Sequence, residues 1–174
     1  MKDYIILVDE NDNQIGIEEK IKAHLDGKLH RAFSIFVFNN KGELLIQQRA
    51  LDKYHSAGLW TNTCCSHPKP EEQIIEAGHR RLKEEMEFDC ELNEAFSFKY
   101  KAVFDNGLTE NEYDHVLIGY YNEEPTLKPE EVGAYKWVSI PFLQEDIKAH
   151  PENYAEWLKI CLEKVVNFIN NENI

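Results

Sequence analysis

The chain has 174 residues, 43% of them hydrophobic and 29% charged, which is typical of a soluble globular protein of about one domain. Its 19 lysines and arginines are outnumbered by 32 acidic residues, so the formal net charge is −13. This balance argues against nucleic-acid binding, which needs a basic field, and against docking on an anionic membrane surface. We therefore expect a single domain over residues 1–174 with neither kind of partner.

Short strands with turn signals between several of them dominate the predicted elements. Asn-Asn-Lys-Gly at 39–42 is a good hairpin turn, and Asn-Gly at 106–107 supplies a second one. The predicted strands are residues 4–8, 33–38, 44–48, 61–65, 96–104, 110–121 and 135–138.

Two longer segments have helical periodicity. In residues 71–87, Ile74, Gly78, Leu82 and Met86 form a stripe that can face a sheet. The second helix is predicted over residues 152–169, with Pro151 where a first helical turn tolerates proline. Many strands with few helices, in no strict alternation, favour an α+β fold with a mixed sheet.

The basic residues are concentrated in one segment. Residues 20–83 contain eleven lysines and arginines but only six acidic residues. Such a segment in an acidic protein suits a small anion, although chance clustering on solvated faces explains the composition equally well.

The cysteines and the N-terminus bear on the compartment. No signal-peptide pattern opens the chain, and no apolar stretch approaches the roughly 20 residues of a membrane span. We expect a cytoplasmic protein, so its thiols are reduced and a functional cysteine is catalytic or metal-linked. The cysteines are Cys64, Cys65, Cys90 and Cys161.

Cys-Cys-Ser-His at 64–67 is the most informative motif. In an extended segment, Cys65 and His67 share one face, and Cys64 points the other way. A cysteine beside an imidazole or a metal can donate a proton, accept one or act as a nucleophile. A small buried hydrophobe is the alternative interpretation, and the residues alone leave both open.

Two further groups could hold cations. Glu110 and Glu112 would lie on one face of a strand, and two like charges so placed need a cation or a proton. With His24, His30 and His67 they could form a set suited to Mn²⁺, Zn²⁺ or Fe²⁺. An exposed acidic edge and ordinary hydrogen-bonded histidines remain the alternatives. On the predicted helix, Arg81 and Glu85 are either a surface ion pair or a phosphate contact beside a Mg²⁺ ligand.

Residues 66–88 resemble a Nudix box, the pattern G-x5-E-x7-R-E-U-x-E-E-x-G-U. The positions that fit are Glu72, Arg80, Leu82, Glu84, Glu85 and Phe88. Ser66 and Glu87 stand at the two glycine positions, and Arg81 stands where Nudix hydrolases have a metal-binding glutamate. The resemblance therefore implies a Nudix-like fold but argues against nucleotide hydrolysis.

A longer series of motifs resembles the type 1 isopentenyl-diphosphate isomerases, which are Nudix-fold enzymes. The series runs from His24 to Trp157 and includes Leu-His-Arg-Ala-Phe-Ser at 29–34, Gln-Arg-Ala at 48–50, Trp-Thr-Asn at 60–62, Cys-Ser-His-Pro at 65–68 and Glu-Asn-Glu at 110–112. The resemblance implies an α+β fold of mixed sheets sandwiched by helices, with a C-terminal helix covering the active site. It also implies a monomer or weak dimer acting on a small allylic or homoallylic diphosphate.

The same resemblance implies a role for individual residues. In this family an acid protonates the substrate double bond, which gives a tertiary carbocation. A base then removes a proton from the other side. The implied catalytic residues are Cys65, Glu112 and Tyr100. The implied substrate contacts are Lys20, Arg49, Lys53 and Arg81 for the diphosphate and Trp157 for the reacting centre. The implied ligands of Mn²⁺ or Zn²⁺ are His24, His30, His67, Glu110 and Glu112, and those of a Mg²⁺ shared with the substrate are Glu85 and the Cys65 carbonyl.

Two other functions stay open. One is a Nudix pyrophosphohydrolase, from which Arg81 distinguishes the chain. The other is a non-catalytic binding module that keeps the metal ligands, which deuterium uptake into the substrate would separate from an isomerase.

Overall fold

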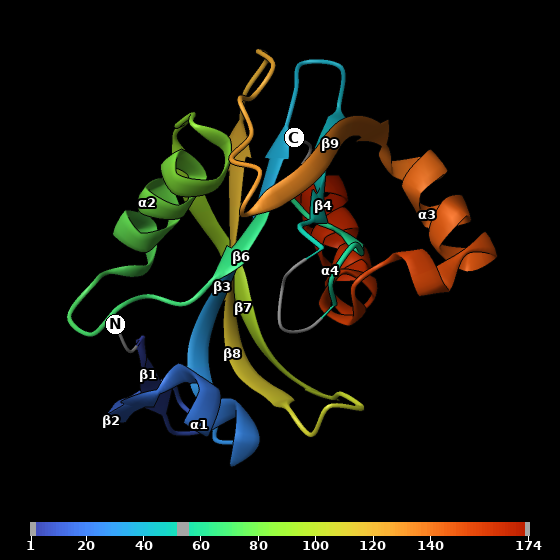
Figure 1. Cartoon of the computed structure of the whole chain (residues 1–174). Helices are drawn as coiled ribbons and strands as arrows, with labels where there is room; N and C mark the ends of the chain where they lie inside the picture. Colours follow the sequence, from blue (N-terminus) through green and yellow to red (C-terminus); the bar gives the residue numbers. More distant parts are fainter. Residues whose placement is uncertain (1–2, 52–55, 173–174) are drawn as a thin grey trace.

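In the computed structural model, which describes residues 3–51 and 56–172, nine strands join one mixed sheet with helices on both sides (Figure 1). This α+β architecture confirms the expected fold class. The strands are β1 Tyr4–Val8, β2 Gln14–Glu19, β3 His30–Phe38, β4 Glu43–Arg49, β5 Trp60–Thr61, β6 Cys64–Ser66, β7 Leu92–Val103, β8 Thr109–Tyr120 and β9 Val132–Ser139. The helices are α1 Lys20–Leu25, α2 Ile74–Met86, α3 Ile140–Ala149 and α4 Glu156–Glu172, with a 3₁₀ turn at Pro151–Asn153.

Strand β3 is the centre of the sheet. It runs parallel to β8 along its whole length and antiparallel to the short β6. The register places His30 opposite Glu112 on β8 and Ser34 opposite Cys65 on β6. Paired residues on neighbouring strands project to the same face. The polar residues of three strands therefore gather on one side of the sheet.

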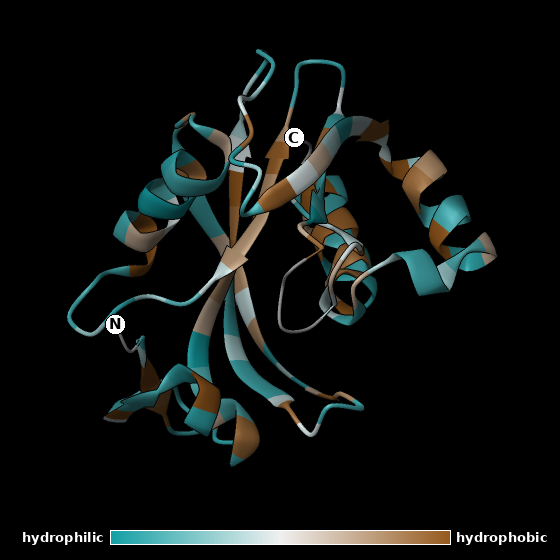
Figure 2. Ribbon diagram, viewed as in Figure 1, coloured by the Kyte–Doolittle hydropathy of each residue, from teal (hydrophilic) through white to brown (hydrophobic). Residues whose placement is uncertain are grey.

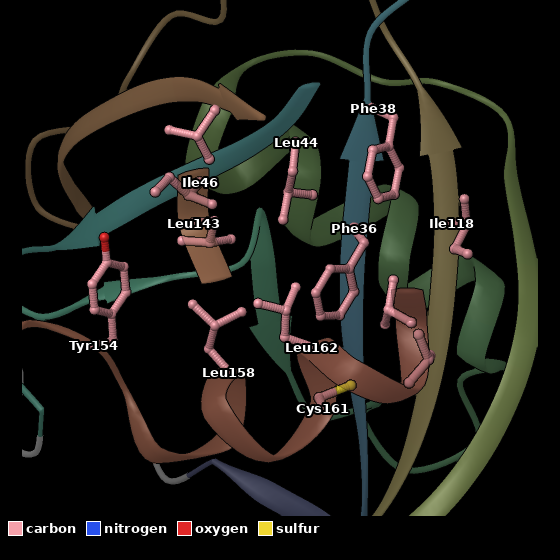
Figure 3. Packing of buried hydrophobic residues seen from close by; sticks show 13 residues of the cluster. Phe36, Phe38, Leu44, Ile46, Ile118, Leu143, Tyr154, Leu158, Cys161 and Leu162 are labelled. Atoms are coloured by element: carbon pink, nitrogen blue, oxygen red, sulfur yellow. The ribbon is translucent and has the colours of Figure 1, made fainter. Parts of the chain in front are cut away.

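Alternation along β3 separates two hydrophobic clusters. Phe33, Ile35 and Val37 pack with α2, whereas Phe36 and Phe38 pack on the opposite face with α4. Figure 3 shows the second cluster, in which α4 contributes Leu158, Cys161 and Leu162. Both faces of the upper sheet are covered, so β3 is an almost continuous run of buried residues.

Helix α2 has the predicted apolar stripe. Gly78, Leu82 and Met86 are buried against the sheet, while the outer face of the helix is largely hydrophilic (Figure 2). The Glu76 carboxylate accepts a hydrogen bond from the Gln73 backbone N–H, which starts the helix later than residue 71. Glu87 ends the helix in the left-handed conformation, with φ 52°.

The prediction of one continuous strand over residues 61–65 is wrong. The segment breaks into β5 and β6, because Asn62 and Thr63 bond to the backbone through their side chains. Thr63 Oγ1 accepts from Val37 N at 2.9 Å and donates to Leu45 O at 2.7 Å. These bonds replace a regular ladder between strands.

The C-terminal helix begins later than predicted. Pro151 lies in a separate 3₁₀ turn, and α4 begins at Glu156. Between them, Tyr154 forms a bridge with Trp60, and Ala155 N donates to Trp60 O at 2.9 Å. That pairing holds the intervening backbone extended and delays the helix.

Three elements were not predicted. Strand β2 lies at a sheet edge and leaves Ile15 and Ile17 exposed, and α1 is too short to show a period. For α3 a signal existed, since Ser139 accepts from Phe142 N and Pro141 stands in the first turn. Across the described ranges, no helix is long and apolar enough to cross a membrane.

We expect Glu87→Gly to raise the free energy of unfolding. The left-handed conformation costs an L-residue roughly 1–2 kcal/mol, and the added freedom of glycine in the unfolded chain cancels about 0.4–1 kcal/mol of that gain. A net stabilisation of roughly 0.5–1 kcal/mol should appear in urea unfolding. Glu87→Ala is the matched control, because alanine keeps the strain, and an equal gain in that variant would contradict the explanation.

Candidate active site

A pocket opens on the polar face where β3, β6, β7 and β8 run side by side. Figure 2 shows β8 hydrophilic towards the turn after β7 and hydrophobic at its far end, so the pocket lies at the hydrophilic end. The predicted site residues that line it are Lys20, Arg49, Cys65, His67, Arg81, Glu85, Tyr100, Glu110, Glu112 and Trp157. His24 and His30 are fully buried near them, and Lys53 lies outside the described residues.

Three histidines and a glutamate form a tight cluster. One ligand atom from each of His24, His30, His67 and Glu112 lies within 4.8 Å of the others. The imidazole centroids are 4.7 Å apart for His24 and His30 and 5.1 Å apart for His30 and His67. The cluster joins α1, β3, β8 and the loop after β6, which are far apart in the sequence.

The hydrogen bonds of this cluster leave ring nitrogens aimed inward. His24 Nδ1 donates to Lys20 O at 2.7 Å, and His30 Nδ1 donates to Lys28 O at 2.8 Å. The Nε2 atoms of both rings are buried and have no hydrogen-bond partner, and that of His30 lies 3.5 Å from Glu112 Oε1. Backbone acceptors that fix the tautomer in this way are the usual support of metal-binding histidines.

The protonation states of the cluster residues favour the binding of a cation. Burial lowers the pKa of His67 to about 3 and also lowers that of His24, so both rings are neutral at pH 7. His67 Nε2 lies 3.1 Å from Glu112 Oε1. Burial alone would raise the pKa of Glu112, but the His30 and His67 imidazoles outweigh it and hold this pKa below its ordinary value. Neutral imidazoles and an ionised carboxylate fit a divalent metal ion.

Tyr100 connects the two glutamates. Its hydroxyl lies 2.7 Å from Glu112 Oε2 and 3.0 Å from Glu110 Oε2, and it can donate its one proton to either. Burial, with the nearby charge of Glu112, raises the pKa of Glu110 to about 9. The shared Tyr100 hydroxyl places Glu110 next to Glu112, but Glu110 is not one of the four residues of the cluster.

The two adjacent cysteines have different surroundings. Cys64 is fully buried in the hydrophobic cluster beneath α2. Cys65 lines the pocket, and its Sγ lies 3.1 Å from Asn62 Oδ1. Burial raises the pKa of Cys65, so this sulfur is a thiol at pH 7. The alternation expected of an extended segment therefore holds, and His67 lines the same pocket as Cys65.

Arg81 lies among carboxylates at the other side of the pocket. It forms ion pairs with Glu85, with Glu84 at 2.7 Å and with Glu131 at 3.1 Å. Burial opposes its charge, but these carboxylates, Glu85 first, raise its pKa above the ordinary value. Glu85 also accepts from Gln47 Nε2 at 2.8 Å. A cation and an anionic group could both be held here, by Glu85 and Arg81 respectively.

An aromatic wall and further cations complete the pocket. The Arg49 guanidinium carbon lies 5.3 Å from the centroid of the Trp157 ring, a cation–π distance. Trp157, in the first turn of α4, is buried and packs in a cluster with Tyr100. Burial and the charge of Arg81 lower the pKa of Lys20, which begins α1.

Sequence reasoning missed several polar residues of the site. Ser34, Asn62 and Asp114 surround Cys65, and Glu131 lines the pocket beside Arg81. Ser34 and Asn62 stand within motifs already singled out, and Asp114 continues the alternation of Glu110 and Glu112. Glu131 gave no signal, since the run around it reads as an ordinary solvated loop.

Comparison with known proteins bears on this pocket. The NUDIX domain pattern matches residues 28–159. The chain is 51% identical over 167 residues to "Isopentenyl-diphosphate Delta-isomerase 2" of Aromatoleum aromaticum, covering 96% of this chain and 88% of that protein. It is 50% identical over 174 residues to the protein of the same name from Photorhabdus laumondii, covering 100% and 96% respectively.

A solved structure with a similar fold is the MutT protein from Methanosarcina mazei. The TM-score is 0.66 at 20% sequence identity, covering 83% of this chain and 95% of the other. At this identity the likeness concerns the fold alone.

We expect divalent metal to stabilise the protein through the histidine cluster. At a concentration near 100 Kd, one site adds about 2.7 kcal/mol to the free energy of unfolding. Dialysis against a chelator followed by Mn²⁺ should therefore raise Tm in the wild type, and His30→Ala should lose most of that rise and of the bound metal. His115→Ala is the control, because His115 pairs with Glu94 and Asp12 outside the cluster. Equal metal content in His30→Ala and wild type would contradict the assignment.

Proposed function

The chain belongs to the isopentenyl-diphosphate Delta-isomerases within the NUDIX-domain family, and from this premise we propose that Cys65 and Glu112 carry its reaction. The enzyme interconverts isopentenyl diphosphate and dimethylallyl diphosphate in isoprenoid biosynthesis. The observation that supports the proposal most is the β3 register, which brings Cys65 from β6 and Glu112 from β8 to one pocket from opposite sides.

The reaction moves a double bond by one proton in and one proton out. Protonation of the terminal methylene carbon gives a tertiary carbocation, and loss of a proton from the carbon next to it, on the diphosphate side, completes the shift. The Cys65 thiol and the Glu112–Tyr100 pair serve as the two proton-transfer groups on opposite sides of the substrate. Their roles exchange with the direction of the reversible reaction.

The aromatic wall stabilises the cation. Trp157 and Tyr100 line the pocket and pack in one cluster, and a desolvated cation–π contact with the developing positive charge would contribute as much as about 2 kcal/mol. Because Trp157 belongs to α4, the C-terminal helix also excludes water that would quench the carbocation.

The basic side of the pocket binds the diphosphate. Lys20, Arg49 and Arg81 line it, and Lys53, which lies outside the described residues, completes the proposed set. A Mg²⁺ ion held by Glu85 and the Cys65 carbonyl would neutralise part of the diphosphate charge. Arg81 and Glu85 form an ion pair with each other. The positive Arg81 suits the diphosphate, and the negative Glu85 suits the Mg²⁺ ion.

The histidine cluster holds the base in place. His24, His30, His67 and Glu112, with Glu110 as a fifth ligand, would bind Mn²⁺ or Zn²⁺, which fixes the charge and orientation of the Glu112 carboxylate. The inward Nε2 atoms of His24 and His30 support this ligand set.

We expect Cys65→Ala to abolish isomerisation and Cys64→Ala to preserve it. The first change removes the proton-transfer group, whereas the second removes a buried sulfur from the core beneath α2. Turnover and deuterium uptake from heavy water into isopentenyl diphosphate measure the effect, and circular dichroism checks the fold. Near-wild-type turnover of Cys65→Ala would refute the role of this thiol.

Arg81→Gln should weaken diphosphate binding. Loss of a charge-assisted hydrogen bond costs about 1.5–3 kcal/mol, so KM should rise by roughly 10–100-fold. Arg80→Gln is the matched control, because the Arg80 guanidinium bonds to Glu72 and Glu84 and does not line the pocket. An unchanged KM in Arg81→Gln would count against Arg81 as an anchor.

A further inference from the structure

The Cys65 thiol is held by residues that the proposed reaction has not yet used. Cys65 Sγ donates to Asn62 Oδ1 at 3.1 Å and lies 3.5 Å from Ser34 Oγ. Ser34 Oγ in turn donates to Asp114 Oδ2 at 2.8 Å. The sulfur therefore has one polar neighbour on each of two sides, from the β5–β6 connection and from β3.

The orientation of Asn62 is fixed by its other bonds. Its Nδ2 donates to Ile35 O at 2.9 Å and to Cys64 O at 3.0 Å, and these carbonyls can only accept. The amide oxygen must then face the Cys65 thiol, and Thr61 Oγ1 donates to it as well, at 2.9 Å. Asn62 is fully buried, so neither water nor a flip of the amide offers an alternative arrangement.

Ser34 is similarly restricted. Its hydroxyl donates to Asp114 Oδ2, and the Asp114 side chain belongs to a residue that is 1% exposed. The bond to Asp114 restricts rotation of the Ser34 hydroxyl, so the Ser34 oxygen stays next to the Cys65 sulfur. Register adds to this restriction, because Ser34 and Cys65 are direct antiparallel partners on β3 and β6.

We propose that Asn62 is a positioning residue for isomerisation, which holds the S–H bond of Cys65 in one direction while Ser34, tied to Asp114, holds the sulfur from the other side. The proposal rests on the proposed role of Cys65. Asn62 does not line the pocket and so does not touch the substrate. Its removal should therefore lower kcat and leave KM unchanged.

The kinetic test compares two neighbours with different contacts. We expect Asn62→Ala to reduce kcat by roughly 10–100-fold, the effect of a small misplacement of a reacting group, with KM within about twofold of wild type. Thr63→Val is the matched control, since Thr63 bonds to Val37 N and Leu45 O in the same segment but not to the thiol. An equal loss of kcat in Thr63→Val, or a raised KM with unchanged kcat in Asn62→Ala, would overturn the proposal.

A spectroscopic test needs no substrate and so is independent of the proposed function. The infrared S–H stretching band of Cys65 is identified by its loss in Cys65→Ala. We expect Asn62→Ala to shift this band to higher wavenumber, because the thiol loses its acceptor, and Thr63→Val to leave it in place. An unshifted band in Asn62→Ala would refute the positioning role.

Two further outcomes separate the alternatives. If the wild type lacks isomerase activity while the band shifts as expected, the proposed function fails and the positioning of the thiol stands. If Asn62→Ala does not fold, the S–H stretching band of Cys65 in the wild type serves as the test. A wavenumber below that of a free thiol in apolar solvent would support the proposal, and an equal wavenumber would overturn it.

Discussion

The register of β3 against β6 and β8 is the constraint on which the pocket depends. One face of β3 gives His30 and Ser34 to the site, and the other gives Phe33 and Ile35 to the core beneath α2. A slip of one residue would exchange the two faces. The long parallel pairing with β8 and the apolar packing of both sheet faces prevent that slip. The chemistry therefore relies on hydrophobic contacts at the far end of the same strands.

Burial gives the site its character and also opposes folding. Buried imidazole nitrogens that lack a hydrogen-bond partner and closely spaced carboxylates each cost free energy in the protein alone. The surrounding core offsets this cost, and a bound cation would remove part of it. Burial also keeps Cys65 a thiol and raises the pKa of Glu110, whereas the His30 and His67 imidazoles hold the pKa of Glu112 low.

Much of this arrangement could be predicted where one local rule decides it. Alternation put Cys65 on one face with His67 and Cys64 on the other, the family resemblance assigned Cys65 to the site, and the apolar stripe placed α2 against the sheet. The break at Asn62 could not be predicted, because it depends on carbonyls of β3 and β4 that are distant in the sequence. Glu131 was missed for the same reason, since only the tertiary fold brings it to Arg81.

The distribution of the pocket along the chain has a consequence for synthesis. The cluster takes His24 from α1, while Glu112 comes from β8 and Trp157 from α4. During translation the histidines leave the ribosome long before their carboxylate partner, and the aromatic wall follows later still. A truncated or half-made chain thus holds neither a complete ligand set nor a covered pocket. Carbocation formation by the proposed mechanism therefore needs a chain that extends past Trp157, so that the aromatic wall and the start of α4 are in place.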